Sequence, residues 1–162
     1  MTAIHDQSDT QPEIMKIEKR EAPSPQMLLA TIHASVGEAV MLLAWDPKWL
    51  HASLGDLEWL VAPAIMANQF MTLRGKVKNK DGEETGATIP LGLALWAKVS
   101  EEVDAKLKAQ KEAGAPLRLA PQDWTSGDIP WLVLTVGPEA VRKSLIDKAR
   151  EAQGGKRVEF EV

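Results

Sequence analysis

The sequence predicts an α/β (α+β) domain in which one mixed, mainly antiparallel sheet is flanked by helices. The chain of 162 residues is long enough for a single domain with a real core. Helix-type and strand-type hydrophobic spacings alternate along it. Their order is helix, strands, helix, strand, helix, strand, which is typical of a sheet with helices packed against it.

The first element is a helix that follows a polar leader. Acidic and polar side chains dominate residues 1–23, so we expect this leader to be disordered and the domain to span residues 24–162. Ser24-Pro25 suits the N-cap and the first helical position. Apolar residues at spacings of three and four continue the helix to about Trp45, and Asp46-Pro47 ends it.

The middle of the chain predicts a hairpin that leads into a buried strand. A helical or irregular stretch runs over residues 48–61, and Pro63 closes it. Strand-like residues follow over 64–74. Turn residues over 78–82, strongest at Asp-Gly, then lead to an apolar strand over 89–99.

The last third predicts two helices and two strands. Ser100 caps a helix with acidic residues in its first turn and lysines in its last, and Gly114 stands where such a helix ends. A buried strand over 131–136 is followed by Gly137-Pro138-Glu139, which opens a final helix. Alternating apolar and charged residues over 156–162 predict a half-buried strand.

Composition excludes several classes of function. The chain has no cysteine, which removes disulfides, thiolate metal sites and a cysteine nucleophile. Together with the absence of a secretory signal this favours a cytoplasmic location. No apolar run approaches the roughly 20 residues that span a bilayer. A net charge of −4 argues against a nucleic-acid binder, and three scattered histidines offer no metal-ligand spacing.

Four basic residues form the one clear cluster of positive charge: Arg74, Lys76, Lys78 and Lys80. Because they stand at every second position, they would share one face of an extended segment. Two interpretations remain open. The lysines protect the edge of a hairpin, or they form a docking patch for an acidic partner.

Three segments carry a resemblance to a known family. They are Asp56–Phe70, Leu95–Glu102 and Pro121–Asp128. The first contains a Pro-Ala-Ile-x-Ala-Asn-Gln-Phe run and the last an Asp-Trp-Thr-Ser-Gly-Asp run. In this order and spacing, over roughly residues 34–136, they look like the toxin-activating lysine acyltransferases, the HlyC-like family. That family usually continues into a Pro-Phe-Gly-type segment, where this chain has Val136-Gly137-Pro138-Glu139.

The resemblance implies a fold similar to the Gcn5-related acetyltransferases and a homodimer. It also implies an activity, in which a fatty acyl group passes from acyl carrier protein to internal lysines of an RTX-type protein, without a bound cofactor. Acyl carrier protein is acidic, so the basic cluster gains a partner through charge steering. The alternative is a catalytically impaired member that serves as a binding or assembly factor.

The positions that match the family's proposed catalytic pair do not hold a histidine and an aspartate. Counted without gaps, they read Trp49 and Leu134. His51 is the candidate base because a histidine pKa lies near neutrality, although two helical residues turn a side chain by about 200°. A surface histidine is the competing interpretation. Asp128 is the candidate catalytic aspartate, with turn formation as its competing role.

Polar and aromatic residues of the matched segments are candidate contacts for the acyl chain or substrate. For the hydroxyl-bearing residues the competing role is turn formation, and for the tryptophans it is the core. The candidates are Asn68, Gln69, Trp124, Thr125, Ser126 and Trp131, with Asp123, Trp59 and Trp96 as further possible linings.

Overall fold

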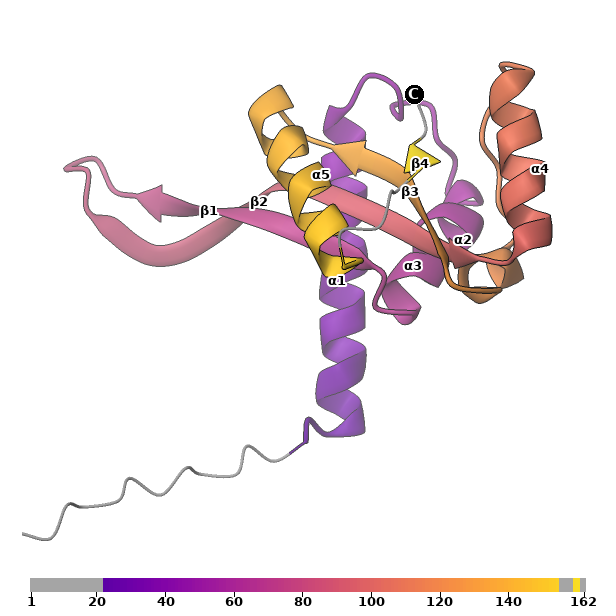
Figure 1. The fold of residues 1–162 in the computed structure, drawn as a ribbon. Helices are drawn as coiled ribbons and strands as arrows, with labels where there is room; N and C mark the ends of the chain where they lie inside the picture. The colour runs from indigo at the N-terminus through magenta and orange to yellow at the C-terminus, as the bar shows by residue number, and fades with distance from the viewer. Residues whose placement is uncertain (1–21, 155–158, 161–162) are drawn as a thin grey trace, which may run out of the picture.

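Four strands form one mixed sheet in the computed structural model, which describes residues 22–154 and 159–160 (Figure 1). The strands are β1 (Phe70–Lys78), β2 (Glu84–Val99), β3 (Ile129–Val136) and β4 (Glu159–Phe160), in that order across the sheet. β1, β2 and β3 are antiparallel neighbours, and β4 pairs in parallel with β3. The expected fold class is therefore confirmed. Residues 1–21 of the expected leader and the side chains of the expected C-terminal strand lie outside the described residues.

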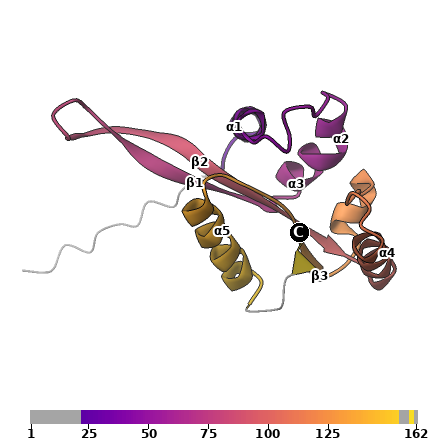
Figure 2. The ribbon, with the colours of Figure 1, turned by 90° about the horizontal axis from the view of Figure 1, so that it is seen from above.

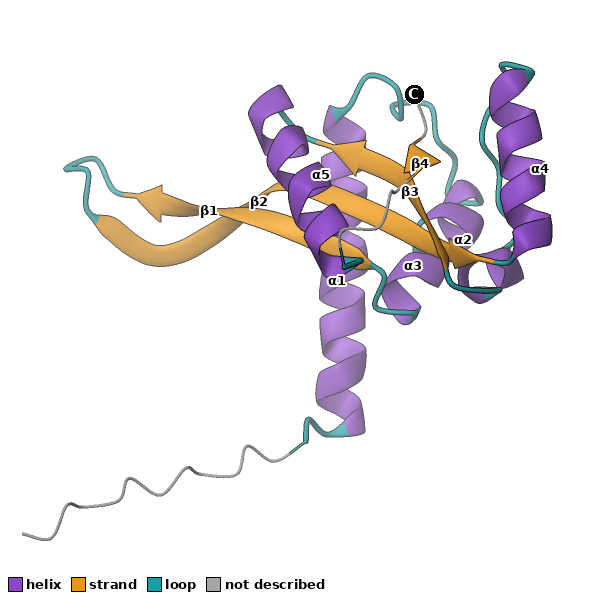
Figure 3. Cartoon of the chain, in the orientation of Figure 1, coloured by secondary structure: helices purple, strands orange, loops and turns teal. Residues whose placement is uncertain are grey.

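Helices cover both faces of the sheet, as Figure 2 shows from above and Figure 3 by element type. The helices are α1 (Pro25–Trp45), α2 (Asp56–Leu60), α3 (Ala62–Met66), α4 (Glu101–Glu112) and α5 (Glu139–Ala152), with a 3₁₀ turn η1 (Pro121–Thr125). The first three lie on one face and α5 on the other. α4 and η1 lie at the end of the sheet where β2 finishes.

The side-chain alternation of β2 divides the core into two parts. Leu93, Leu95 and Ala97 belong to the larger cluster with α1, α3 and α4, whereas Ala94 and Trp96 pack with α5. A bulge interrupts the β2–β3 pairing, because Leu95 pairs with Leu134 but Trp96 pairs with Leu132.

The predicted helix caps are confirmed. The Ser24 Oγ accepts a hydrogen bond from the Met27 N–H at 3.2 Å, and α1 ends at Trp45. The Ser100 Oγ accepts from the Val103 N–H at 3.3 Å. Gly114 adopts a φ of 65° just after α4.

Two predicted boundaries were wrong. Pro63 does not close a helix. It lies in the first turn of α3, where its missing N–H costs nothing, and Ala64 is helical rather than extended. The strand begins at Phe70 after Asn68, whose φ of 54° turns the chain. β2 begins at Glu84 instead of residue 89 because pairing in the hairpin, not burial, sets its length.

α1 bears on the expectation that no segment spans a membrane. Within the described ranges, it is the single helix long and apolar enough to cross a bilayer by length and composition. Isolated polar residues such as Thr31, His33 and Glu38 interrupt its apolar run, which is why the sequence pattern did not single it out. Its Ala39, Leu42 and Leu43 are buried in the core.

Gly127 should tolerate no side chain. A Cβ there would lie 2.5 Å from the Val99 carbonyl oxygen and 2.7 Å from the Ser100 Cα, and these are backbone atoms that cannot move aside. Gly127→Ala should therefore lower the free energy of unfolding by about 1–3 kcal/mol, measured by urea denaturation. Gly55→Ala is the control, since its Cβ would meet only the Ser53 Oγ at 3.5 Å. Equal midpoints for the two variants would contradict the close contact.

Candidate functional site

The loop after α1 places Trp49, which stands where the family histidine is expected. The Asp46 carboxylate accepts from the Lys48 N–H at 2.9 Å, and the Asp46 carbonyl accepts from the Trp49 N–H at 2.9 Å. These bonds fold the loop into a tight turn. Trp49 is half-buried against the larger core cluster.

Trp49 forms one wall of a groove of about 440 Å³. The lining residues are Lys48, Trp49, Trp59, Pro116, Leu117 and Arg118. The guanidinium of Arg118 lies 5.5 Å from the centre of the Trp59 ring, and the Lys48 ammonium lies 5.6 Å from that of Trp49. This volume is within the range of small-molecule sites. The groove therefore offers apolar walls with two cations on aromatic faces.

A second hollow of about 360 Å³ lies beside the same loop. Leu42, Trp45, Asp46, Pro47, Leu91, Val136, Gly137 and Pro138 line it. Gly137 has a φ of 132°, and a Cβ there would lie 2.8 Å from the Leu91 carbonyl oxygen. The segment where the chain departs from the family's Pro-Phe-Gly pattern thus forms a wall of this hollow.

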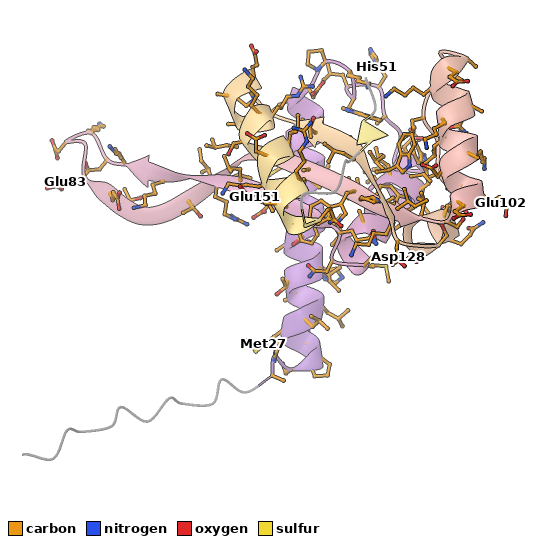
Figure 4. All side chains as sticks on the ribbon, viewed as in Figure 1. Met27, His51, Glu83, Glu102, Asp128 and Glu151 are labelled. Carbon is orange, nitrogen blue, oxygen red and sulfur yellow. The ribbon has the colours of Figure 1, made fainter. Side chains whose placement is uncertain are left out.

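The structure does not bring His51 and Asp128 together. His51 is exposed on the loop between α1 and α2, whereas Asp128 is exposed just before β3 begins. Figure 4 shows the two residues well apart, with His51 near the top of the view and Asp128 below, where β3 begins. They do not form a hydrogen-bonded pair in this arrangement.

The two positions matched to the family's catalytic residues are apolar in structure as well as in sequence. Leu134 is 4% exposed and belongs to the larger core cluster, and Trp49 packs against the same cluster. Neither side chain can accept a proton. These two positions therefore offer no acid–base pair.

Two carboxylates with lowered pKa values hold tryptophans in place. The Trp59 indole N–H, followed by the N–H and hydroxyl of Ser53, donates to Asp56 and lowers its pKa. Burial raises the pKa of Asp104, but hydrogen bonds from Lys108 and Trp131 and the Lys108 charge outweigh it and lower that pKa overall. A carboxylate with a lowered pKa stays charged and accepts a proton poorly. Asp56 and Asp104 are therefore suited to anchoring hydrogen bonds and not to general-base catalysis.

Two candidate substrate contacts, Gln69 and Trp124, lie together in the interior. The buried Gln69 donates from Nε2 to the Trp124 carbonyl at 3.2 Å. Trp124, with no exposed surface, donates from Nε1 to the Trp59 carbonyl at 2.7 Å. Among the described residues, the Gln69 Oε1 has no hydrogen-bond partner. Asn68 beside it is exposed and makes the turn into β1.

The remaining candidates serve the turn and the core. The Ser126 Oγ accepts from the Ser100 N–H at 2.9 Å and donates to the Asp123 carbonyl at 2.9 Å. Thr125 is exposed. Trp131 has no exposed surface and donates to the Asp104 carboxylate at 2.8 Å. Trp96 packs with α5.

Sequence reasoning missed the wall formed by residues 116–118. The segment between α4 and η1 has no regular structure, so no helix or strand pattern pointed to it. Leu117 and Leu119 are nevertheless buried on either side of the exposed Arg118. The alternation of apolar and charged residues over 117–119 is the sequence signal that could have indicated a half-buried segment here.

The basic cluster runs from the middle of β1 into the turn of the β1–β2 hairpin. Figures 1 and 4 show this hairpin projecting from the domain. Arg74, Lys76 and Lys78 are exposed while the residues between them are half-buried, as the spacing of two predicts. Arg74 pairs with Glu38, and Lys76 pairs with Glu84 at 2.9 Å. Lys78 and Lys80 are exposed nearer the tip.

The comparison with known families covers more of the chain than the three segments that carry the resemblance. Residues 30–158 match the family model HlyC, described as the RTX toxin acyltransferase family. The match runs from within α1 to the residue before β4, so it includes the loop, both hollows and η1. No curated protein matches the chain.

The Asp104 anchor should make stability depend on pH. Because the folded-state pKa lies below the ordinary value of 3.8, the carboxylate contributes stability above that value and loses it as the pH falls through the folded-state pKa. Asp104→Asn keeps an acceptor for Trp131 but loses the charge that pairs with Lys108. It should cost about 0.5–1 kcal/mol at pH 7 and less at pH 3, by urea denaturation. An equal cost at both pH values would contradict this role.

Proposed function

The chain belongs to the RTX toxin acyltransferase family, and we propose that it moves a fatty acyl group from acyl carrier protein to internal lysines of an RTX-type protein. The family match over residues 30–158 carries this proposal. The groove beside Trp49 supports it, because apolar walls suit an acyl chain. A cytoplasmic location, a homodimer and the absence of a bound cofactor are part of the same proposal.

Transfer begins when a neutral lysine amine attacks the thioester carbonyl. The carbon–sulfur bond then breaks, the carrier leaves as its thiol, and the acyl group remains on the lysine as an amide. The acyl chain lies against Trp49, Trp59 and Leu117 in the groove. Arg118 and Lys48 face the polar end of the donor, where positive charge favours a phosphate. The groove thereby holds the thioester at a fixed place, and positioning alone lowers the barrier substantially.

The lysine ammonium must lose a proton before its nitrogen can attack. The two positions matched to the family's catalytic pair offer no group that accepts this proton. Trp49 and Leu134 remove the acid–base contribution, which is typically about 10²–10⁴ in rate. The lysine ammonium therefore loses its proton to solvent, or to His51 on the exposed loop. A slow enzyme that works mainly by positioning is the consequence.

The same two substitutions favour a second function, a binding or assembly factor. In that case the groove and the hairpin bind the acylated carrier, and no transfer follows. Retained binding without acylation distinguishes this function from the first.

The pH dependence of transfer should show which acceptor takes the proton. With solvent as acceptor, the single-turnover rate should rise about tenfold per pH unit from pH 6 to 9, because a lysine pKa is near 10.4. Transfer from long-chain acyl carrier protein to a lysine-bearing acceptor would be followed by mass spectrometry. His51→Gln should leave this profile unchanged.

Two other results have distinct meanings. A plateau above pH 7 that His51→Gln abolishes would establish His51 as the base and contradict the solvent route. No acylation at any pH, with carrier binding retained, would replace the transferase by the binding factor.

Charge reversal on the hairpin should weaken carrier binding. Arg74 and Lys76 are already paired with acidic residues, so Lys78→Glu with Lys80→Glu is the sharper variant. Its Kd for acyl carrier protein should rise several-fold at low salt and less at high salt. Lys143→Glu with Lys148→Glu on α5 changes the net charge equally and is the control. Equal Kd values for the two double variants would remove the hairpin as docking site.

A further inference from the structure

The hollow beside Gly137 has a single charged residue in an otherwise apolar lining. Of the eight residues around its volume of about 360 Å³, Asp46 alone carries a charge. Asp46 is half-buried, and no cation pairs with it among the residues that the structure describes. A carboxylate in apolar surroundings is costly unless a positive charge meets it. The hollow is therefore complementary to an apolar ligand that ends in a positive charge.

The apolar walls of this hollow are held by the core. Leu42 and Val136 line it and are buried in the larger core cluster. A Cβ on Gly137 would lie 2.8 Å from the Leu91 carbonyl oxygen and 3.1 Å from the Gly92 Cα, so the backbone here lies tightly against β2. The hollow thus keeps its shape without a ligand, as small-molecule sites usually do.

We propose that this hollow binds the side chain of the acceptor lysine, with the lysine ammonium on the Asp46 carboxylate. A lysine side chain has a stem of four methylene groups, which packs on apolar surface, and a charged end that needs a polar partner. Trp45 lines the hollow and adds an aromatic surface, which attracts an ammonium group. The proposal rests on the proposed function, because that function supplies a lysine as the acceptor.

Other cations suit the hollow less well. The Asp46 Oδ1 already accepts from the Lys48 N–H at 2.9 Å, and within the described ranges Oδ2 has no hydrogen bond. Arginine binds a carboxylate best through two parallel hydrogen bonds, whereas a lysine ammonium needs only one oxygen. A divalent metal ion needs several oxygen ligands, and this lining contains one carboxylate.

The position of the hollow suits an acceptor because one short segment lines both cavities. Trp45, Asp46 and Pro47 line the hollow, and Lys48 and Trp49 line the groove proposed for the acyl chain. Asp46 also fixes this segment, since its side chain and its carbonyl accept from the next two N–H groups but one. A single turn of the chain thus holds the sites of donor and acceptor next to each other, as transfer between two substrates requires.

Asp46 selects the acceptor and is not the group that removes its proton. A carboxylate favours the charged form of a lysine, so the bound ammonium still loses its proton by the routes given above before the nitrogen attacks. Asp46 is therefore a specificity-determining residue. Its loss should weaken acceptor binding more than it slows turnover.

Binding of a lysine probe tests the proposal without reference to acyl transfer. Nα-acetyl-lysine N-methylamide, titrated into the full chain labelled with ¹⁵N, should shift the backbone amide signals of Trp45 and Gly137. Asp46→Asn should raise the Kd of this probe about tenfold, while its amide oxygen still accepts from the Lys48 N–H and keeps the turn. Asp147→Asn, at an exposed position of α5, changes the charge equally and should leave the Kd unchanged.

Two related probes test charge and shape separately. The norleucine counterpart keeps the apolar stem without the ammonium, and the arginine counterpart replaces the ammonium by a guanidinium; both should bind more weakly than the lysine probe. A norleucine or arginine probe that binds as tightly as the lysine probe would overturn the proposal. Equal Kd values of the lysine probe for the wild-type chain and Asp46→Asn would overturn it as well.

Transfer kinetics distinguish this proposal from the proposed function. With a lysine-bearing peptide as acceptor, Asp46→Asn should raise the KM for the peptide about tenfold with little change in kcat. A lower kcat with an unchanged KM would overturn the proposal. A chain that acylates nothing but binds the lysine probe through Asp46 would contradict the proposed activity and support the lysine site.

Discussion

The buried indole of Trp124 is the contact on which the arrangement of the site depends. Its Nε1 donates to the Trp59 carbonyl, and its own carbonyl accepts from the Gln69 side chain. One residue of η1 therefore joins the residue before β1 and a residue of α2, which lie 55 and 65 positions earlier in the chain. Three positions further on, Gly127 approaches the backbone at the end of β2 closely enough to exclude any side chain. The groove owes its Trp59 wall to this junction.

This junction changes what the family motifs mean. The two runs that carry the resemblance contain Gln69, Trp124, Ser126 and Gly127, and in the structure these residues bind one another or neighbouring backbone. Keeping them preserves the scaffold. Trp49 and Leu134, the positions that the resemblance matches to a catalytic pair, lie outside these runs, and both pack with the larger core cluster.

The fold was largely predictable because its signals are local. Ser24 and Ser100 cap their helices through hydrogen bonds three residues away, so the sequence pattern contains the whole interaction. The helix end predicted at Pro63 was wrong because a proline is equally common after the end of one helix and in the first turn of the next. The site was less predictable. The groove joins Trp49 to Arg118, and no local pattern relates residues so far apart.

We propose that the acyl chain lies in the groove beside Trp49 and not in the hollow beside Gly137. The two lie next to one loop but have different walls, so the position of a bound chain decides between them. The most direct measurement uses an acyl carrier protein whose fatty acyl group ends in a photoreactive diazirine. After irradiation, peptide mass spectrometry locates the label. Labels on Trp49, Trp59 or Leu117 are the predicted result, and labels on Leu91 or Pro138 would contradict the account.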